Sequence, residues 1–144
     1  MTKTDAFWDA SALVPLCVNQ GASPLARAAL KNKTLAAWWG TPVEMTGAFS
    51  RLSRNGDIGR DSFRMAISRL AALRQRWVEV QPTEALRELA EELLLRHPLR
   101  AADSLQLAAA LVWSNRQPRK RRFVCFDGRL AEAAANEGFT VETI

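Results

Sequence analysis

Two aspartates directly follow short apolar runs of the sequence. Asp9 comes after Ala6-Phe7-Trp8, and Asp127 comes after Phe123-Val124-Cys125-Phe126. An ionised carboxylate beside a buried strand loses several kcal/mol of hydration free energy unless a cation or hydrogen-bond donors compensate for it. These two acids therefore need a chemical explanation.

Two further acids lie in the first turns of expected helices. Glu44 follows Pro42 near the start of one helix, and Asp103 opens another, on a face that it shares with Leu107 and Ala110. Each of the four acids could simply stabilise or cap a helix N-terminus, an effect of roughly 0.3–1 kcal/mol for a charge near the helix dipole. Whether they do more depends on where the fold places them.

Apolar runs typical of buried strands alternate with helical periodicity along the whole chain. The expected strands span residues 6–9, 35–39, 77–80, 123–126 and 139–141, and the expected helices span residues 12–18, 23–32, 42–54, 60–76, 83–96, 99–115 and 130–136. Such an alternation predicts an α/β fold, with a parallel sheet covered by helices on both faces. The length of 144 residues suits a single domain, 1–144.

All four acids should meet at one edge of this sheet. Asp9 and Asp127 end strands, Glu44 follows the second strand, and the helix of Asp103 leads back down to the fourth strand, so its N-terminus lies at the carboxyl edge. Ligands bind at that edge in open α/β sheets. Clustered carboxylates resist ionising together, and Mg²⁺ removes that conflict because it prefers oxygen ligands. Helix capping does not explain why all four acids should share an edge, so we expect a Mg²⁺ site there.

Composition favours a nucleic-acid partner and excludes some chemistry. The formal net charge is +5, and all but four of the 20 basic residues are arginine, whose planar fork suits phosphate oxygens. The one histidine, His97, excludes a mechanism built on a histidine pair, and we expect it to end a helix. Cys17 and Cys125 have no metal-ligand spacing and are expected to be buried thiols. With no run of about 18 apolar residues and no signal peptide, we expect a cytoplasmic protein without a membrane partner.

Four segments together resemble the PIN-domain nucleases, and most closely the VapC-type toxins of toxin–antitoxin pairs. They cover nearly the whole chain, in the order and at the spacing of that family. The matching segments are Phe7-Trp8-Asp9-Ala10-Ser11-Ala12-Leu13, Thr41-Pro42-Val43-Glu44, Leu99-Arg100-Ala101-Ala102-Asp103-Ser104-Leu105-Gln106-Leu107-Ala108 and Phe126-Asp127-Gly128-Arg129-Leu130-Ala131. Two details depart from the family pattern: Trp8 precedes the first aspartate, and Gln106 stands where histidine is frequent.

The resemblance implies a specific architecture and activity. It implies a three-layer α/β/α sandwich whose five-stranded parallel sheet has the order 3-2-1-4-5. It also implies a Mg²⁺- or Mn²⁺-dependent endoribonuclease that cleaves RNA, forms a homodimer and is neutralised by a small antitoxin protein. In that case Asp9, Glu44, Asp103 and Asp127 would be the catalytic metal ligands.

Several polar residues near these acids have more than one possible role. Ser11 could cap a helix or position Asp9, and Arg100 and Arg129 could bind substrate phosphate or pair with the acids. We expect Arg51, Arg54, Arg60 and Arg64, on helices nearer the catalytic edge, to be better candidates for binding the RNA substrate than the basic run 116–122. That run precedes the fourth strand, so it should be a solvated loop at the amino edge.

Two other functions compete with catalysis. The chain could be a PIN-fold binding module that acts mainly within an antitoxin–DNA autorepressor complex, although the intact acidic set argues against a loss of catalysis. A receiver-like phosphoacceptor domain would need an acidic pair after the first strand and an acceptor aspartate after the third. Here Ala10 and Gln81-Pro82 occupy those places, which excludes it.

Overall fold

Five short strands pair in parallel in the order β3-β2-β1-β4-β5. They are β1 (Ala6–Trp8), β2 (Ala36–Trp38), β3 (Val78–Val80), β4 (Arg122–Cys125) and β5 (Thr140–Thr143). The structure, a computed structural model, describes residues 3–126 and 128–144. The predicted α/β class and the predicted strand order are both confirmed.

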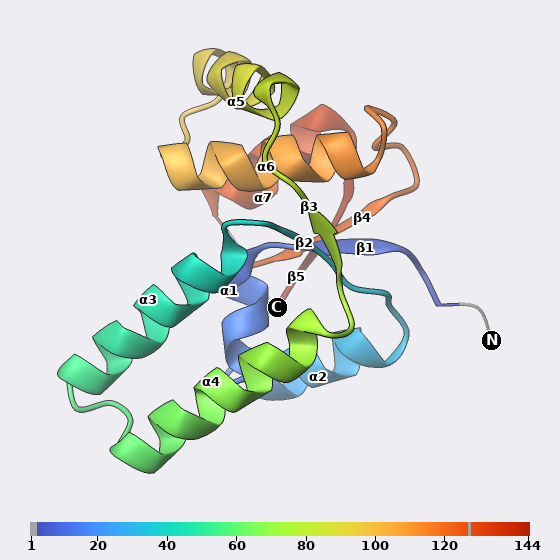
Figure 1. Cartoon of the computed structure of the whole chain (residues 1–144). Coiled ribbons are helices and arrows are strands. Elements are labelled where there is room, and N and C mark those ends of the chain that lie inside the picture. The colour runs from blue at the N-terminus through green and yellow to red at the C-terminus, as the bar shows by residue number, and fades with distance from the viewer. Residues whose placement is uncertain (1–2, 127) are drawn as a thin grey trace.

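Helices cover both faces of the sheet and complete an α/β/α sandwich (Figure 1). One face carries α1 (Ala10–Leu13), the short 3₁₀ helix η1 (Val14–Leu16), α2 (Ser23–Lys31), α3 (Thr41–Arg54) and α4 (Arg60–Arg74). The other carries α5 (Glu84–Arg96), α6 (Ala101–Trp113) and α7 (Arg129–Glu137). In the described part of the chain no helix combines the length and the apolar character needed to cross a membrane.

The central strand β1 is buried on both sides, and its alternation builds two cores. Phe7 packs among α5, α6 and α7 and stacks on Phe123 with ring centroids 5.7 Å apart. Ala6 and Trp8 point to the opposite core, which includes Met45 of α3. All three residues of β1 are fully buried, so Asp9 directly follows a strand that lies in the protein interior.

Two helices begin elsewhere than predicted. The expected helix 12–18 starts earlier, at Ala10, because Asp9 caps it by accepting from the backbone N–H of Ser11 at 3.2 Å. It changes to 3₁₀ geometry at Val14–Leu16, where Pro15 lacks the N–H that an α-helical turn would use. Helix 99–115 is shorter than predicted, since Arg100 is extended and Asn115 has a positive φ of 55°.

The basic run 116–122 lies at the amino edge, as predicted. Its Arg121 pairs with Asp5, just before β1, at 3.2 Å and lies over the Trp113 ring at 5.4 Å. The Arg121–Asp5 ion pair therefore lies on the side of the sheet away from the carboxyl ends of the strands. The buried Lys33, which precedes β2, pairs with Glu142 of β5 at 2.7 Å.

Candidate active site

Two adjoining hollows open at the carboxyl edge of the sheet, and both are lined by Asp9, Ser11, Asp103 and Phe126. One, of about 300 Å³, also reaches Glu44 and Arg51. The other, of about 400 Å³, also reaches Arg100, Arg129 and Pro98. Three of the four predicted acids therefore share one concave region, as the parallel topology requires.

Asp9 is the most buried of these acids, with 6% of its surface exposed. Burial raises the pKa of its carboxyl from the ordinary 3.8 to about 6, although hydrogen bonds from Ser11 oppose the change and Asp103 adds to it. The Ser11 hydroxyl donates to Asp9 Oδ2 and accepts from the backbone N–H of Phe126 at 3.3 Å. Ser11 thus links the end of β1 to the end of β4.

The side chain of Glu44 is held by a buried amide from the other face of the sheet. Gln106 of α6 is fully buried, and its Nε2 donates to Glu44 Oε2 at 2.5 Å and to Thr41 Oγ1 at 3.0 Å. Burial raises the pKa of Glu44 from 4.5 to about 7. The Gln106 hydrogen bond lowers it, and the charges of Asp9 and Asp103 raise it further. These charge effects place the three carboxylates within electrostatic range of one another.

The helix of Glu44 is positioned by a close backbone approach. Gly40, which precedes α3, lies so near Trp38 that a Cβ there would be 2.5 Å from the indole nitrogen. The missing side chain lets α3 begin immediately after β2. Glu44 consequently falls in the first turn of α3, beside the sheet edge.

The donor chemistry of this cluster fits a hard divalent cation. Carboxylate oxygens are the preferred ligands of Mg²⁺ and Mn²⁺, and their mutual repulsion is the condition that a cation would relieve. Among residues 3–126 and 128–144, however, no three acidic, histidine or cysteine side chains form a group that could hold an ion by themselves. The fourth predicted acid, Asp127, lies outside the described residues.

The candidate arginines differ in whether they line the two hollows. Arg51, Arg100 and Arg129 line the two hollows, and none of them forms an ion pair in the part of the chain that the structure describes. Arg100 and Arg129 are therefore not paired with Asp9, Glu44 or Asp103. Arg54 and Arg60 are exposed at the far ends of α3 and α4 and line neither hollow.

Sequence reasoning missed three contributors to this region. Gln106 carried no signal beyond its departure from the family pattern, and its contact with Glu44 spans 62 residues of sequence. Gln20, which lies between two expected helices, and Phe126, at the end of an expected strand, also line the smaller hollow, and neither was given a role. The exposure of Phe126 would have been the sign, but exposure cannot be read from the sequence.

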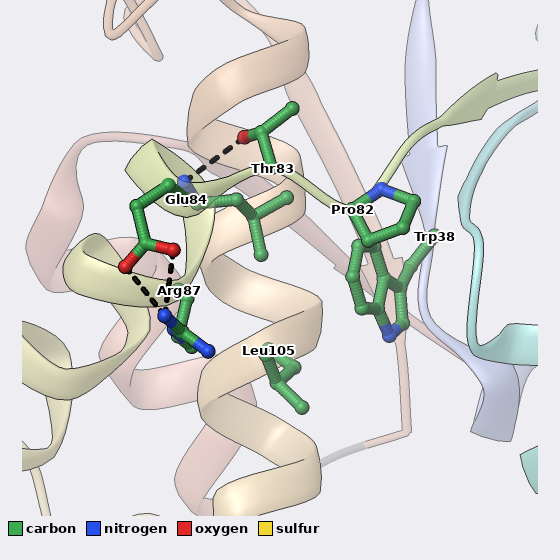
Figure 2. Close-up of a pocket in the computed structure, with 7 residues that line it drawn as sticks. Trp38, Pro82, Thr83, Glu84, Arg87 and Leu105 are labelled. Atoms are coloured by element: carbon green, nitrogen blue, oxygen red, sulfur yellow. Dashed lines mark hydrogen bonds and ion pairs between the residues drawn. The ribbon is translucent and has the colours of Figure 1, made fainter.

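A third hollow lies apart from the acids, between β2, α5 and α6. Figure 2 shows Trp38 and Pro82 on one side of it and Leu105 on the other, with Glu84 and Arg87 facing each other at its rim. The Glu84–Arg87 pair is 2.6 Å long and exposed. Because its charged groups are already paired on the surface of one helix, this hollow offers no set of groups for catalysis.

Solved structures with this architecture are toxins and toxin–antitoxin complexes. VapC20 of Mycobacterium tuberculosis, a sarcin–ricin loop cleaving toxin, is 21% identical, with a TM-score of 0.64 over 94% of this chain and 96% of that one. The chain has the fold of the VapC toxins. VapBC2 of Rickettsia felis, bound to a DNA fragment from its promoter, gives 0.66 at 14% identity over 98% and 99% of the two chains.

A third structure agrees with these two. A toxin–antitoxin complex from Klebsiella pneumoniae is 17% identical, with a TM-score of 0.57 over 85% of this chain and 86% of that one. No protein-family model matches the sequence, and no curated protein is similar to it. The VapC-like fold inferred from the four sequence segments is thus confirmed by three-dimensional similarity.

Proposed function

We propose that this protein is a metal-dependent endoribonuclease that acts as the toxin of a toxin–antitoxin pair. The observation that carries the proposal is the convergence of Asp9, Glu44 and Asp103 at the carboxyl edge of a VapC-like sheet. The arginines of the same hollows form no ion pair with any described residue, which supports a phosphate-bearing substrate. The similar VapC20 of M. tuberculosis cleaves the sarcin–ricin loop, which supports RNA as the substrate class.

Each residue has a distinct part in the proposed hydrolysis. Asp9, Glu44 and Asp103, together with Asp127, would hold Mg²⁺ or Mn²⁺, which supplies an activated water and charge neutralisation. Ser11 fixes the carboxylate of Asp9, and Gln106 fixes that of Glu44. Arg100 and Arg129 would orient the phosphate.

Cleavage assays with and without chelator test this proposal. The protein should cleave single-stranded or loop RNA with Mg²⁺ or Mn²⁺ and not in EDTA, and Asp103→Asn should be inactive while remaining folded. If a bound metal supplies the attacking water, the ribose hydroxyl takes no part in the attack and the products should carry no cyclic phosphate. Asp61→Asn, an exposed acid on α4, is the matched control and should retain activity. Cleavage that persists in excess chelator would contradict the metal mechanism.

The proposed partners are a small antitoxin protein and a second copy of the chain. The similar structures from R. felis and K. pneumoniae are toxin–antitoxin complexes, which supports the first partner. Co-expression with the product of a neighbouring short gene, followed by co-purification and a mass measurement in solution, tests both. A monomer that copurifies with nothing would count against this part of the proposal.

The alternative is a binding module that works mainly within an antitoxin–DNA autorepressor complex. It is favoured by one observation, since the R. felis VapBC2 structure includes a promoter DNA fragment. Under this alternative, Asp103→Asn would leave DNA binding by the complex unchanged, and the wild-type protein would cleave no RNA with either metal.

A further inference from the structure

An aromatic side chain stands in the middle of the polar site. Phe126 follows β4, is 38% exposed and lines both hollows. A single exposed apolar residue is ordinary on a protein surface. This one differs because the residues that line the same hollows include the acids Asp9 and Asp103 and the basic residues Arg51 and Arg129.

The backbone of Phe126 is tied to the catalytic residues. Its N–H donates to Ser11 Oγ at 3.3 Å, and the Ser11 hydroxyl in turn donates to Asp9. The preceding residue, Cys125, accepts from the backbone of Ile144 at 3.1 Å. The backbone that carries the ring is consequently held at a fixed place relative to the Asp9 carboxylate.

Charge surrounds the ring on both sides. Arg51 belongs to the smaller hollow, Arg100 and Arg129 belong to the larger one, and Phe126 is common to the two. An anionic chain that crosses from one hollow to the other would meet cations on either side of an apolar face. Alternating cationic and aromatic groups are the means by which proteins hold a single nucleic-acid strand.

We infer that Phe126 is a stacking platform for an unpaired base of the RNA substrate, next to the phosphate that is cleaved. The inference rests on the proposed ribonuclease function and specifies its substrate as a nucleotide whose base is unstacked from its neighbours. A base inside a double helix is covered on both faces, so RNA recognition through aromatic rings takes place in single strands, loops and bulges.

A binding cycle between protein and RNA variants tests the inference. The affinity of a short labelled single-stranded RNA is measured in EDTA for the wild type and for Phe126→Leu, and again with RNAs that lack one base at successive positions. Stacking on an aromatic ring predicts that Phe126→Leu weakens binding about 5- to 150-fold. Removal of the stacked base should weaken wild-type binding by a similar factor and should leave Phe126→Leu unchanged.

Two control variants separate stacking from general effects. Phe126→Trp keeps an aromatic face and should retain binding, which shows that loss in the leucine variant is not a folding defect. Leu95→Ala removes an 89% exposed apolar side chain on α5, outside both hollows, and should bind RNA as the wild type does.

The possible failures are distinguishable. If the wild type cleaves RNA but the protein and base substitutions have independent effects at every position, stacking is refuted and the nuclease stands. If Phe126→Leu binds RNA normally but no longer binds the antitoxin, the ring serves the protein partner and the inference is overturned. A wild type that neither binds nor cleaves RNA overturns both proposals.

Discussion

Replacing Asp9 with asparagine should stabilise the protein at neutral pH in the presence of EDTA. Burial raises the pKa of Asp9 from 3.8 to about 6, so the folded protein holds this proton more tightly than the unfolded chain does. Between about pH 4 and pH 6 the native state therefore binds more protons, and its stability falls as the pH rises. At about 1.4 kcal/mol for each tenfold change in proton affinity, the ionised carboxylate costs up to about 3 kcal/mol at pH 8.

The asparagine variant escapes this cost and keeps the local structure. Asparagine caps helices as well as aspartate does, so it can still accept from the backbone of Ser11 at the start of α1. Asp9→Asn should match the wild type near pH 4 and exceed its free energy of unfolding by up to about 3 kcal/mol at pH 8. For a domain of this size the melting temperature would rise by about 6–12 °C.

Urea unfolding in EDTA at pH 4, 6 and 8 measures the difference directly. Asp61→Asn, which removes an exposed carboxylate on α4 and leaves Asp9 in place, is the control and should follow the wild type at each pH. Added Mg²⁺ should stabilise the wild type more than Asp9→Asn. The stabilisation of the wild type should be larger at pH 8 than at pH 5, because protons compete with Mg²⁺ for the carboxylates. An asparagine variant that is less stable than the wild type at pH 8 would refute the reasoning, since Asp9 would then be a structural carboxylate.

Two more predictions concern the charged residues. Lys33→Met should lower the free energy of unfolding in urea by about 1–3 kcal/mol, below the usual 3–5 for a broken buried pair, because the Glu142 side chain is 30% exposed. Unchanged stability would show that the pair contributes nothing. Substituting Arg100 and Arg129 with glutamine should raise the KM for RNA more than substituting both basic residues at 119–120, which lie at the amino edge. A larger effect of the loop variant would place the substrate path elsewhere.

The architecture was predictable because it depends on local patterns. The three central strands β1, β2 and β4 contain short apolar runs, and the burial of β1 on both faces follows directly from Ala6-Phe7-Trp8. Parallel pairing then determines which ends of the strands meet. The helix starts were less predictable, because Asp9 and Ser11 compete to cap α1, and only their geometry decides that Asp9 does so.

The contacts within the site depend on packing that sequence spacing does not encode. The Gln106–Glu44 hydrogen bond joins residues 62 positions apart, and it forms because α6 and α3 meet across the end of β2. The arginines differ in position along their helices: Arg51 of α3 lines the smaller hollow, whereas Arg54, at the end of the same helix, lines neither hollow. A pattern of residue types therefore locates the acidic edge but does not select which cations serve it.

The burial of the acids explains why this edge is suited to a cation. Asp9 directly follows the buried strand β1, and Glu44 contacts the fully buried Gln106 of α6. Both carboxylates therefore lie where ionisation is costly. Ser11 and Gln106 donate to the ionised forms but do not restore ordinary pKa values. Protonation or a bound cation relieves the remaining cost, whereas a substrate phosphate alone would increase it. The same burial that destabilises the fold at neutral pH is therefore what would favour binding of the metal before the RNA.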